Sequence, residues 1–152
     1  MVTANKITAL IIVFSFFDYA ATYKCSIGWY PGYRGNCYYF SRFGATFWSA
    51  MSFCKTVGGK LVEIDSYREF NEITRMAIKK RFPTFWIGIT DLYYEGAWQK
   101  ATTQARQSYF RWYSGEPNSD GGKENCVEVY TNRGMTWNDQ SCSDQNPFVC
   151  EK

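Results

Sequence analysis

Six cysteines constrain the fold of this chain more than any other feature: Cys25, Cys37, Cys54, Cys126, Cys142 and Cys150. An even number of cysteines in a small extracellular domain predicts that all of them form disulfides. Their spacing alone leaves every pairing open. A zinc site is disfavoured, because the sequence contains no Cys-x-x-Cys pair and no histidine.

The N-terminal segment decides whether these cysteines meet an oxidising compartment. Lys6 precedes an apolar stretch from Ile7 to Phe17, and small residues follow around Ala21. This pattern predicts a signal peptide at residues 1–21 and a secreted mature domain at residues 22–152. The alternative is an uncleaved anchor, but a membrane-spanning helix needs about 20 apolar residues. No later segment is apolar enough either, so we expect no membrane span.

Length and charge exclude other classes of protein. A chain of 152 residues suits one compact domain, and its net charge is only +3 at pH 7. The basic residues Lys79-Lys80-Arg81 lie at the expected end of a helix, where cations suit the helix dipole. A nucleic-acid-binding surface needs a larger basic cluster. We therefore expect no nucleic-acid partner.

The order of the expected elements, helices first and strands afterwards, predicts an α+β domain. A Gly- and Tyr-rich hairpin is expected at residues 25–40. Thr46 is the expected N-cap of a helix that ends at Gly58-Gly59, and a capping box at Ser66–Glu69 opens a second helix that ends before Pro83. Short strands are expected at residues 61–64, 85–89, 109–113, 127–130 and 147–150. Trp86, Trp98, Trp112 and Trp137 are assigned to the core, and Glu63, Asp65 and Glu72 to the surface.

Carboxylates and carboxamides gather in the C-terminal third of the chain, at Glu116, Asn118, Glu124, Asn138 and Asp139. All five side chains offer oxygen atoms, and no histidine accompanies them. Oxygen-only sets suit Ca²⁺, which takes about 6–8 oxygen ligands at ~2.3–2.6 Å. A catalytic zinc or copper ion would normally recruit His or Cys. These five residues therefore predict a calcium site, within a turn-rich segment too long for a simple connection.

Several motifs occur in an order that resembles the C-type lectin-like domain in its long form, over Cys25 to Glu151. They are Cys25-Ser26-Ile27-Gly28-Trp29, Cys37-Tyr38-Tyr39-Phe40, Gly58-Gly59-Lys60-Leu61-Val62, Trp86-Ile87-Gly88-Ile89, Glu116-Pro117-Asn118 and Trp137-Asn138-Asp139. The resemblance implies a C-type lectin-like fold, with two helices flanking small antiparallel sheets and a long calcium-binding loop region. It also implies the disulfides Cys25–Cys37, Cys54–Cys150 and Cys126–Cys142, and a cis bond before Pro117.

The resemblance implies a function as well. Members of this family with a complete ligand set bind sugars through calcium, and the same residues contact both metal and sugar. We expect Glu116, Asn118, Glu124, Asn138 and Asp139 to hold Ca²⁺ and to bind the sugar. The Glu-Pro-Asn triplet is typical of mannose, N-acetylglucosamine and fucose recognition. The expected partners are mannose-type glycans, including those of microbial surfaces, and the expected role is innate immune recognition by a secreted lectin.

Four alternatives accompany this interpretation. A second calcium site would use Asp91, Glu95 and Glu124, but Ser119 and Asn125 replace two of its carboxylates. The fold could instead serve to bind a protein or another non-sugar surface. Hydrolysis by a carboxylate pair is disfavoured because calcium would keep both groups ionised, and no histidine is present for a nucleophilic dyad, so we expect no enzyme. A non-covalent homodimer is a hypothesis, because one shallow sugar site binds weakly.

Overall fold

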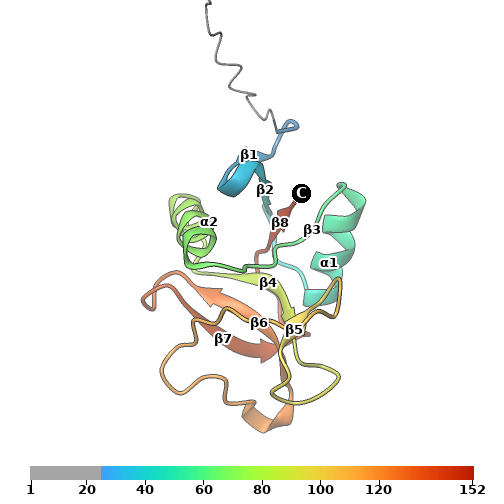
Figure 1. Cartoon of the computed structure of the whole chain (residues 1–152), viewed down its shortest axis with the longest axis vertical. Helices are drawn as coiled ribbons and strands as arrows, with labels where there is room; N and C mark the ends of the chain where they lie inside the picture. The colour runs from blue at the N-terminus through green and yellow to red at the C-terminus, as the bar shows by residue number, and fades with distance from the viewer. Residues whose placement is uncertain (1–24) are drawn as a thin grey trace, which may run out of the picture.

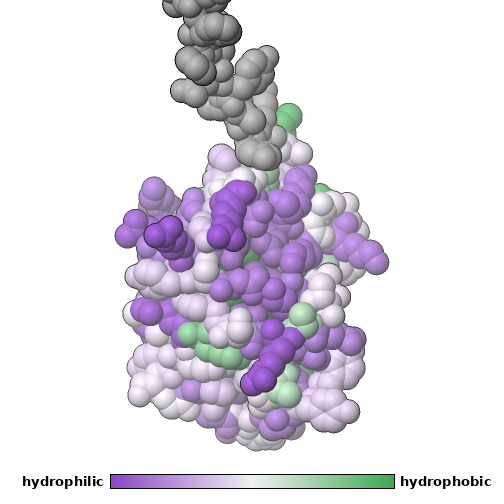
Figure 2. All heavy atoms as spheres, viewed as in Figure 1, coloured by the Kyte–Doolittle hydropathy of each residue, from purple (hydrophilic) through white to green (hydrophobic). Residues whose placement is uncertain are grey.

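The computed structural model describes residues 25–152, so the expected signal peptide at residues 1–21 lies outside the described residues. The described part folds around two small sheets, with a helix on either side of the upper one (Figure 1). None of its helices has the length and apolar character needed to cross a bilayer. Strongly hydrophilic side chains gather over the upper half of the face drawn in Figure 2.

The first sheet joins the two ends of the described chain. Its antiparallel strands are β1 (Tyr30–Pro31), β2 (Cys37–Phe40), β8 (Val149–Glu151) and β3 (Lys60–Leu61), in the order β1-β2-β8-β3. A short 3₁₀ turn, η1 (Tyr33–Gly35), connects the first two strands. The hairpin expected at residues 25–40 is therefore present, and the last strand lies in the middle of the sheet.

The second sheet carries the loop region. Its strands are β5 (Gln99–Lys100), β4 (Thr84–Thr90), β6 (Glu124–Tyr130) and β7 (Thr136–Ser141), all antiparallel in the order β5-β4-β6-β7. Residues Phe85 to Thr90 of β4 are all buried, because the strand is covered on both faces. A second 3₁₀ turn, η2 (Asp120–Gly122), lies in the connection before β6.

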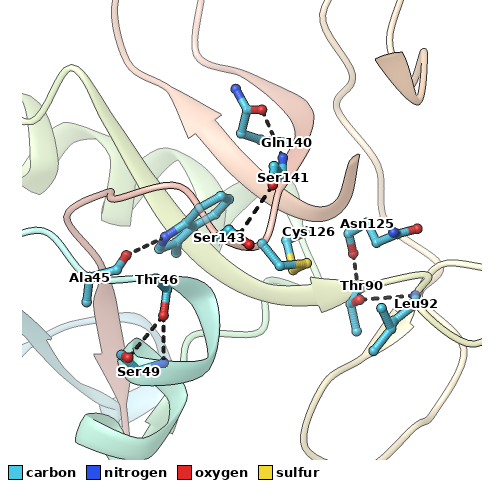
Figure 3. The surroundings of a disulfide bond; sticks show 12 residues. Ala45, Thr46, Ser49, Thr90, Leu92, Asn125, Cys126, Gln140, Ser141 and Ser143 are labelled. Carbon is cyan, nitrogen blue, oxygen red and sulfur yellow. Dashed lines mark hydrogen bonds between the residues drawn. A yellow bond between two sulfur atoms is a disulfide. The ribbon is translucent and has the colours of Figure 1, made fainter. Parts of the chain in front are cut away.

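Both helices begin at the residues that the sequence indicates. Thr46 caps α1 (Phe47–Thr56) by accepting the Ser49 N–H at 3.3 Å (Figure 3). Ser66 caps α2 (Tyr67–Lys79) by accepting the Glu69 N–H at 3.3 Å. The capping box is modified, because the Glu69 carboxylate accepts the Asp65 N–H and the Tyr38 hydroxyl instead of the Ser66 N–H.

Buried apolar side chains form two clusters. One surrounds α2 and the other surrounds α1, and each cluster contains side chains from both sheets. Trp86, Trp98 and Trp137 are buried as expected, whereas Trp112 is only partly buried. The Trp86 indole donates to the Ala45 carbonyl at 2.9 Å, which links β4 to the segment before α1.

Gly88 sits where the two sheets meet. Its N–H donates to the Val62 carbonyl at 2.6 Å, and a Cβ added at Gly88 would lie 2.8 Å from the Leu61 carbonyl oxygen. That distance is too short for any side chain, which accounts for glycine within the Trp-Ile-Gly motif. The expected strand at residues 61–64 is accordingly shorter than predicted. The Val62 N–H still donates to the Val149 carbonyl of β8 at 2.9 Å, but the Val62 carbonyl accepts from Gly88 of β4.

The disulfides follow the pairing that the resemblance implies. They are Cys25–Cys37, Cys54–Cys150 and Cys126–Cys142. The first closes the N-terminal hairpin, the second joins α1 to β8, and the third joins β6 to the residue after β7. The Cys54–Cys150 bridge closes a loop with a sequence separation of 96 residues, which stabilises the fold by about 4–5 kcal/mol in the chain-entropy description.

Two expectations are wrong. Residues 109–113 form no strand, but contact β7 through a single bridge at Trp112. Their aromatic content serves packing, since the Tyr109, Phe110 and Trp112 rings lie 5.6, 6.2 and 5.8 Å from that of Trp137. Glu63 is buried rather than exposed, because it pairs with Lys60 and accepts the Thr102 N–H at 3.0 Å.

Candidate functional site

The predicted ligand residues lie on neighbouring segments at the end of the domain opposite the C-terminus (Figure 1). Glu116 and Asn118 belong to the long connection before η2, Glu124 begins β6, and Asn138 and Asp139 belong to β7. In the β6–β7 pair, Val127 is opposite Asp139. The Glu116–Pro117 peptide bond is cis, as the resemblance implied.

Asp139 fixes the connection to the sheet. Its carboxylate is fully buried, and it accepts the Asn118 N–H at 3.1 Å and the Ser119 N–H at 2.7 Å. Both hydrogen bonds join the long connection to β7. Because each carboxylate oxygen has more than one lone pair, both oxygens keep capacity for a further partner.

Glu116 is the least satisfied member of the group. Its Oε2 atom is buried and has no hydrogen-bond partner. Burial raises the pKa of this carboxyl, repulsion by the nearby Asp139 and Glu124 carboxylates contributes to the same shift, and the resulting pKa is about 7. A buried carboxylate oxygen that has no donor and lies near like charges is favourable only when a cation or a proton accompanies it.

Glu124 approaches the same region from the other end of the connection. Its Oε2 accepts the Asp120 N–H at 2.9 Å. Burial raises the pKa of the Glu124 carboxyl, and so do the charges of Asp139 and Asp120. The Asp139 carboxylate thus makes ionisation of both Glu116 and Glu124 less favourable, and the Glu124 carboxylate has the same effect on Glu116.

Asn138 depends on a residue that the sequence did not single out. Its Nδ2 donates to Glu128 Oε1 at 3.1 Å, and Asn146 Nδ2 donates to Glu128 Oε2 at 2.7 Å. Glu128 lies opposite Asn138 in the β6–β7 pair and is only 3% exposed. The amide orientation of Asn138 is therefore set, with its Oδ1 available to another partner. The only signal in the sequence was a Glu between two valines of a strand.

Thr90 holds the neighbouring strand ends together. Its hydroxyl donates to the Asn125 carbonyl at 2.6 Å and accepts the Leu92 N–H at 3.2 Å (Figure 3). The Cys126–Cys142 disulfide lies next to this contact. These bonds tie the end of β4 to the start of β6, one residue from Glu124.

A second acidic pair lies beside the first group. Asp91 is buried, with Oδ2 accepting the Gly96 N–H at 2.7 Å and Oδ1 without a partner. Burial is the main cause that raises the pKa of Asp91, the charges of Glu95 and Asp139 contribute, and the resulting pKa is about 6. Glu95 accepts a hydrogen bond from the Ser119 hydroxyl at 3.0 Å. Ser119 stands where a second calcium site would have a carboxylate, and its neutral hydroxyl does not neutralise the negative charge of Asp91 and Glu95.

The donor set fits a hard cation. It offers the carboxylates of Glu116, Glu124 and Asp139 and the amide oxygens of two asparagines. Within residues 25–152, no three His, Cys, Asp or Glu side chains are arranged to hold a metal ion by themselves. A cation held here would therefore need asparagine oxygens as well as carboxylates, and Glu116 Oε2 is the buried oxygen of this group that has no hydrogen-bond partner.

Comparison with known proteins assigns the family. Residues 44–152 match the family model described as the Lectin C-type domain. The chain belongs to the C-type lectin domain family. This confirms the resemblance drawn from the motifs, and it confirms the expected fold class of two helices and small antiparallel sheets.

C-type lectin relatives cover most of the described chain. The chain is 32% identical over 153 residues to a perlucin-like protein of Mytilus galloprovincialis, covering 95% of this chain and 97% of that protein. It is 38% identical over 121 residues to a hepatic lectin of Gallus gallus, covering 79% of this chain but only 56% of that protein. The matched proteins are lectins, in agreement with the expectation that this chain is no enzyme.

Solved structures of C-type lectin domains agree in fold. The carbohydrate-recognition domain of cow CD23, in a crystal structure obtained in the presence of a GlcNAc2Man3 oligosaccharide, superimposes with a TM-score of 0.72. That domain is 31% identical, and the match covers 85% of this chain and 95% of the other.

Proposed function

We propose that this C-type lectin binds carbohydrate in a calcium-dependent manner through Glu116, Asn118, Glu124, Asn138 and Asp139. One observation carries the proposal: Glu116 has a buried oxygen without a partner, beside the carboxylates of Asp139 and Glu124. A bound Ca²⁺ would neutralise this repulsion and occupy the free lone pairs. The family supports the proposal, because C-type lectin domains with complete ligand sets generally use calcium.

The five residues have distinct tasks. A bound Ca²⁺ would leave room among these residues for two neighbouring sugar hydroxyls. Each hydroxyl can also donate to Glu116 or Glu124 and accept from the amide of Asn118 or Asn138. Asn138 uses one amide N–H on Glu128, so its second N–H remains for the sugar. Asp139 positions the connection through its bonds to Asn118 and Ser119.

The order of Glu116 and Asn118 bears on which sugars bind. We propose mannose-type ligands, namely mannose, N-acetylglucosamine and fucose, because this order matches the Glu-Pro-Asn triplet of family members with that preference. The CD23 domain crystallised in the presence of a mannose-containing oligosaccharide is consistent with it. The signal-like N-terminus supports secretion, and glycans of microbial surfaces are the proposed partners in innate immune recognition.

Oligomerisation is the route to useful affinity. A single shallow site binds a monosaccharide at about millimolar concentration, or roughly −4 kcal/mol. Linked sites raise the overall affinity without new contacts. We therefore propose a non-covalent homodimer, which sedimentation velocity at working concentration would test. A monomer at every concentration would contradict it.

A glycan array tests the proposed function directly. The disulfide-intact protein is applied in Ca²⁺ and again in EDTA. Signal on mannose-, fucose- or N-acetylglucosamine-terminated glycans that disappears in EDTA supports the proposal. Signal on galactose alone overturns the specificity, and calcium-loaded, folded protein without any signal favours a protein or other non-sugar ligand instead.

A further inference from the structure

A groove lies at the opposite end of the second sheet from the proposed calcium site. It has a volume of about 770 Å³ and is lined by β1, β2, the turn after α2 and residues next to β8. Phe82, which lines the groove, precedes β4, whereas Asp91 follows it directly. Since β4 has seven residues, its ends are separated by roughly 20 Å. The groove is therefore independent of the five proposed ligands.

The charge lining this groove is entirely positive. Arg42, Lys80 and Arg81 line it, and no Asp or Glu does. Across residues 25–152, the ion pairs are formed by Lys60 and Lys100, so none of the three groove cations has a carboxylate partner there. Two of the three belong to the basic run that the sequence places at the end of a helix.

Lys80 is held in place by aromatic rings. Its Nζ lies 3.6 Å from the centroid of the Tyr30 ring and 5.2 Å from that of Phe40. A cation over an aromatic face is oriented without being neutralised. These cations also act on the Tyr30 hydroxyl, because the adjacent Lys80 ammonium and the Arg42 guanidinium lower its pKa.

Arg81 occupies an unusual backbone position. Its φ is +63°, just after the C-cap of α2, where glycine is the usual residue. The chain therefore carries a cation at a position where glycine would be less strained. Arg42 approaches the same groove from the segment after β2, so the two arginines come from elements far apart in sequence.

The groove also has exposed aromatic walls. Tyr30 is 44% exposed and Phe43 is 50% exposed, and both line it. Flat aromatic faces suit the C–H faces of sugar rings, and cations suit anionic substituents on those rings. We propose that this groove binds an anionic polysaccharide, with sulfate or carboxylate groups on Arg42, Lys80 and Arg81 and sugar rings against Tyr30 and Phe43. The binding requires no calcium.

Two other classes of ligand fit the groove less well. Its volume far exceeds that of one inorganic anion, so a single sulfate would leave the aromatic walls uncovered. Nucleic acid normally requires a larger basic surface than a chain with a net charge of +3 provides. An anionic sugar polymer uses the charges and the rings together.

The test compares polymers that differ only in charge. The folded protein is passed over immobilised dextran sulfate, carboxymethyl dextran and plain dextran, in EDTA so that the proposed calcium site cannot contribute. Arg42→Gln combined with Arg81→Gln removes two exposed groove charges. The matched control is Arg68→Gln combined with Arg75→Gln, which removes two exposed charges from α2 outside the groove. Circular dichroism confirms that all variants fold.

We expect binding to one or both charged dextrans and none to plain dextran. The affinity of the groove variant for the charged dextrans should fall about tenfold or more, because it loses charge-assisted hydrogen bonds to the anionic groups. The affinity of the control variant should change by less than about twofold. The ratio of the two charged polymers identifies sulfate or carboxylate as the preferred group. An equal loss in both variants overturns the proposal. So does absence of binding, or binding to duplex DNA or anionic vesicles at least as tight as to dextran sulfate.

Discussion

Asn138 on β7 donates a hydrogen bond from Nδ2 to the buried Glu128 carboxylate on β6, 3.1 Å away. This contact orients the amide of a proposed calcium ligand. Replacing Glu128 by Ala should therefore weaken calcium binding about 10–100-fold, as loss of an outer partner of a metal ligand typically does. Titration calorimetry with Ca²⁺ measures the effect. Glu72→Ala on α2 is the control, and equal calcium affinities of both variants would contradict the role of Glu128.

The sugar preference should depend on which of positions 116 and 118 carries the carboxylate and which carries the amide. Glu116→Gln combined with Asn118→Asp keeps the number of oxygen donors but exchanges their positions. We expect calcium to remain bound, because the total ligand charge is unchanged, while mannose binding is lost. A glycan array in Ca²⁺ and a calcium titration give the two readouts. Unchanged mannose binding would show that these two residues do not select the sugar.

The raised pKa of Glu116 predicts that the stability of the protein depends on pH in opposite directions with and without calcium. Its folded-state pKa is about 7, above the unfolded value of 4.5. Its favourable contribution to stability in the metal-free protein is therefore fully present below pH 4.5 and is lost as the pH rises through 7. Calcium binds the ionised form, so the stabilisation by calcium should grow over the same range.

Thermal unfolding in EDTA and in Ca²⁺ from acid to neutral pH measures both trends. The difference between the two melting temperatures should shrink as the pH falls. A difference that stays constant across this range would contradict the coupling of calcium binding to Glu116 ionisation.

Glu63 and Asp65 provide a matched test of buried against exposed ion pairs. The Glu63 side chain is 1% exposed and pairs with Lys60, whereas the Asp65 side chain is 51% exposed and pairs with Lys100. Glu63→Ala leaves the Thr102 N–H without its acceptor, so we expect a loss of about 2–4 kcal/mol in unfolding free energy. Asp65→Ala should cost at most about 1 kcal/mol. Urea denaturation gives both values, and similar losses would disprove the distinction.

Local chemistry explains which parts of the fold were predictable. The caps Thr46 and Ser66 act on residues three positions away, so their motifs are complete in the sequence. Gly88 is required by a close approach of two strands, but the partner that approaches it is known only from the fold. Glu63 accepts from Thr102 and Glu128 accepts from Asn146, and no local pattern reveals these contacts because both partners lie far along the chain.

The proposed calcium ligands were named from the sequence for a different reason. Their residue types and spacing match a family motif, and the structure places their segments next to one another. The segment at residues 109–113 shows the opposite case, because aromatic residues favour strands and core packing alike. These aromatic rings pack against Trp137, so the segment serves the core and forms no strand. Trp137 lies far along the chain, so the local sequence does not show this contact.

The central position of β8 between β2 and β3 has a practical consequence. Lys152 exchanges backbone hydrogen bonds with Cys37, so the first disulfide and the last residue meet at the same pole of the domain. The proposed sugar-binding loops lie at the other pole (Figure 1). A tag, a bead or a neighbouring domain joined at Lys152 would therefore present these loops outward, toward whatever surface the lectin meets.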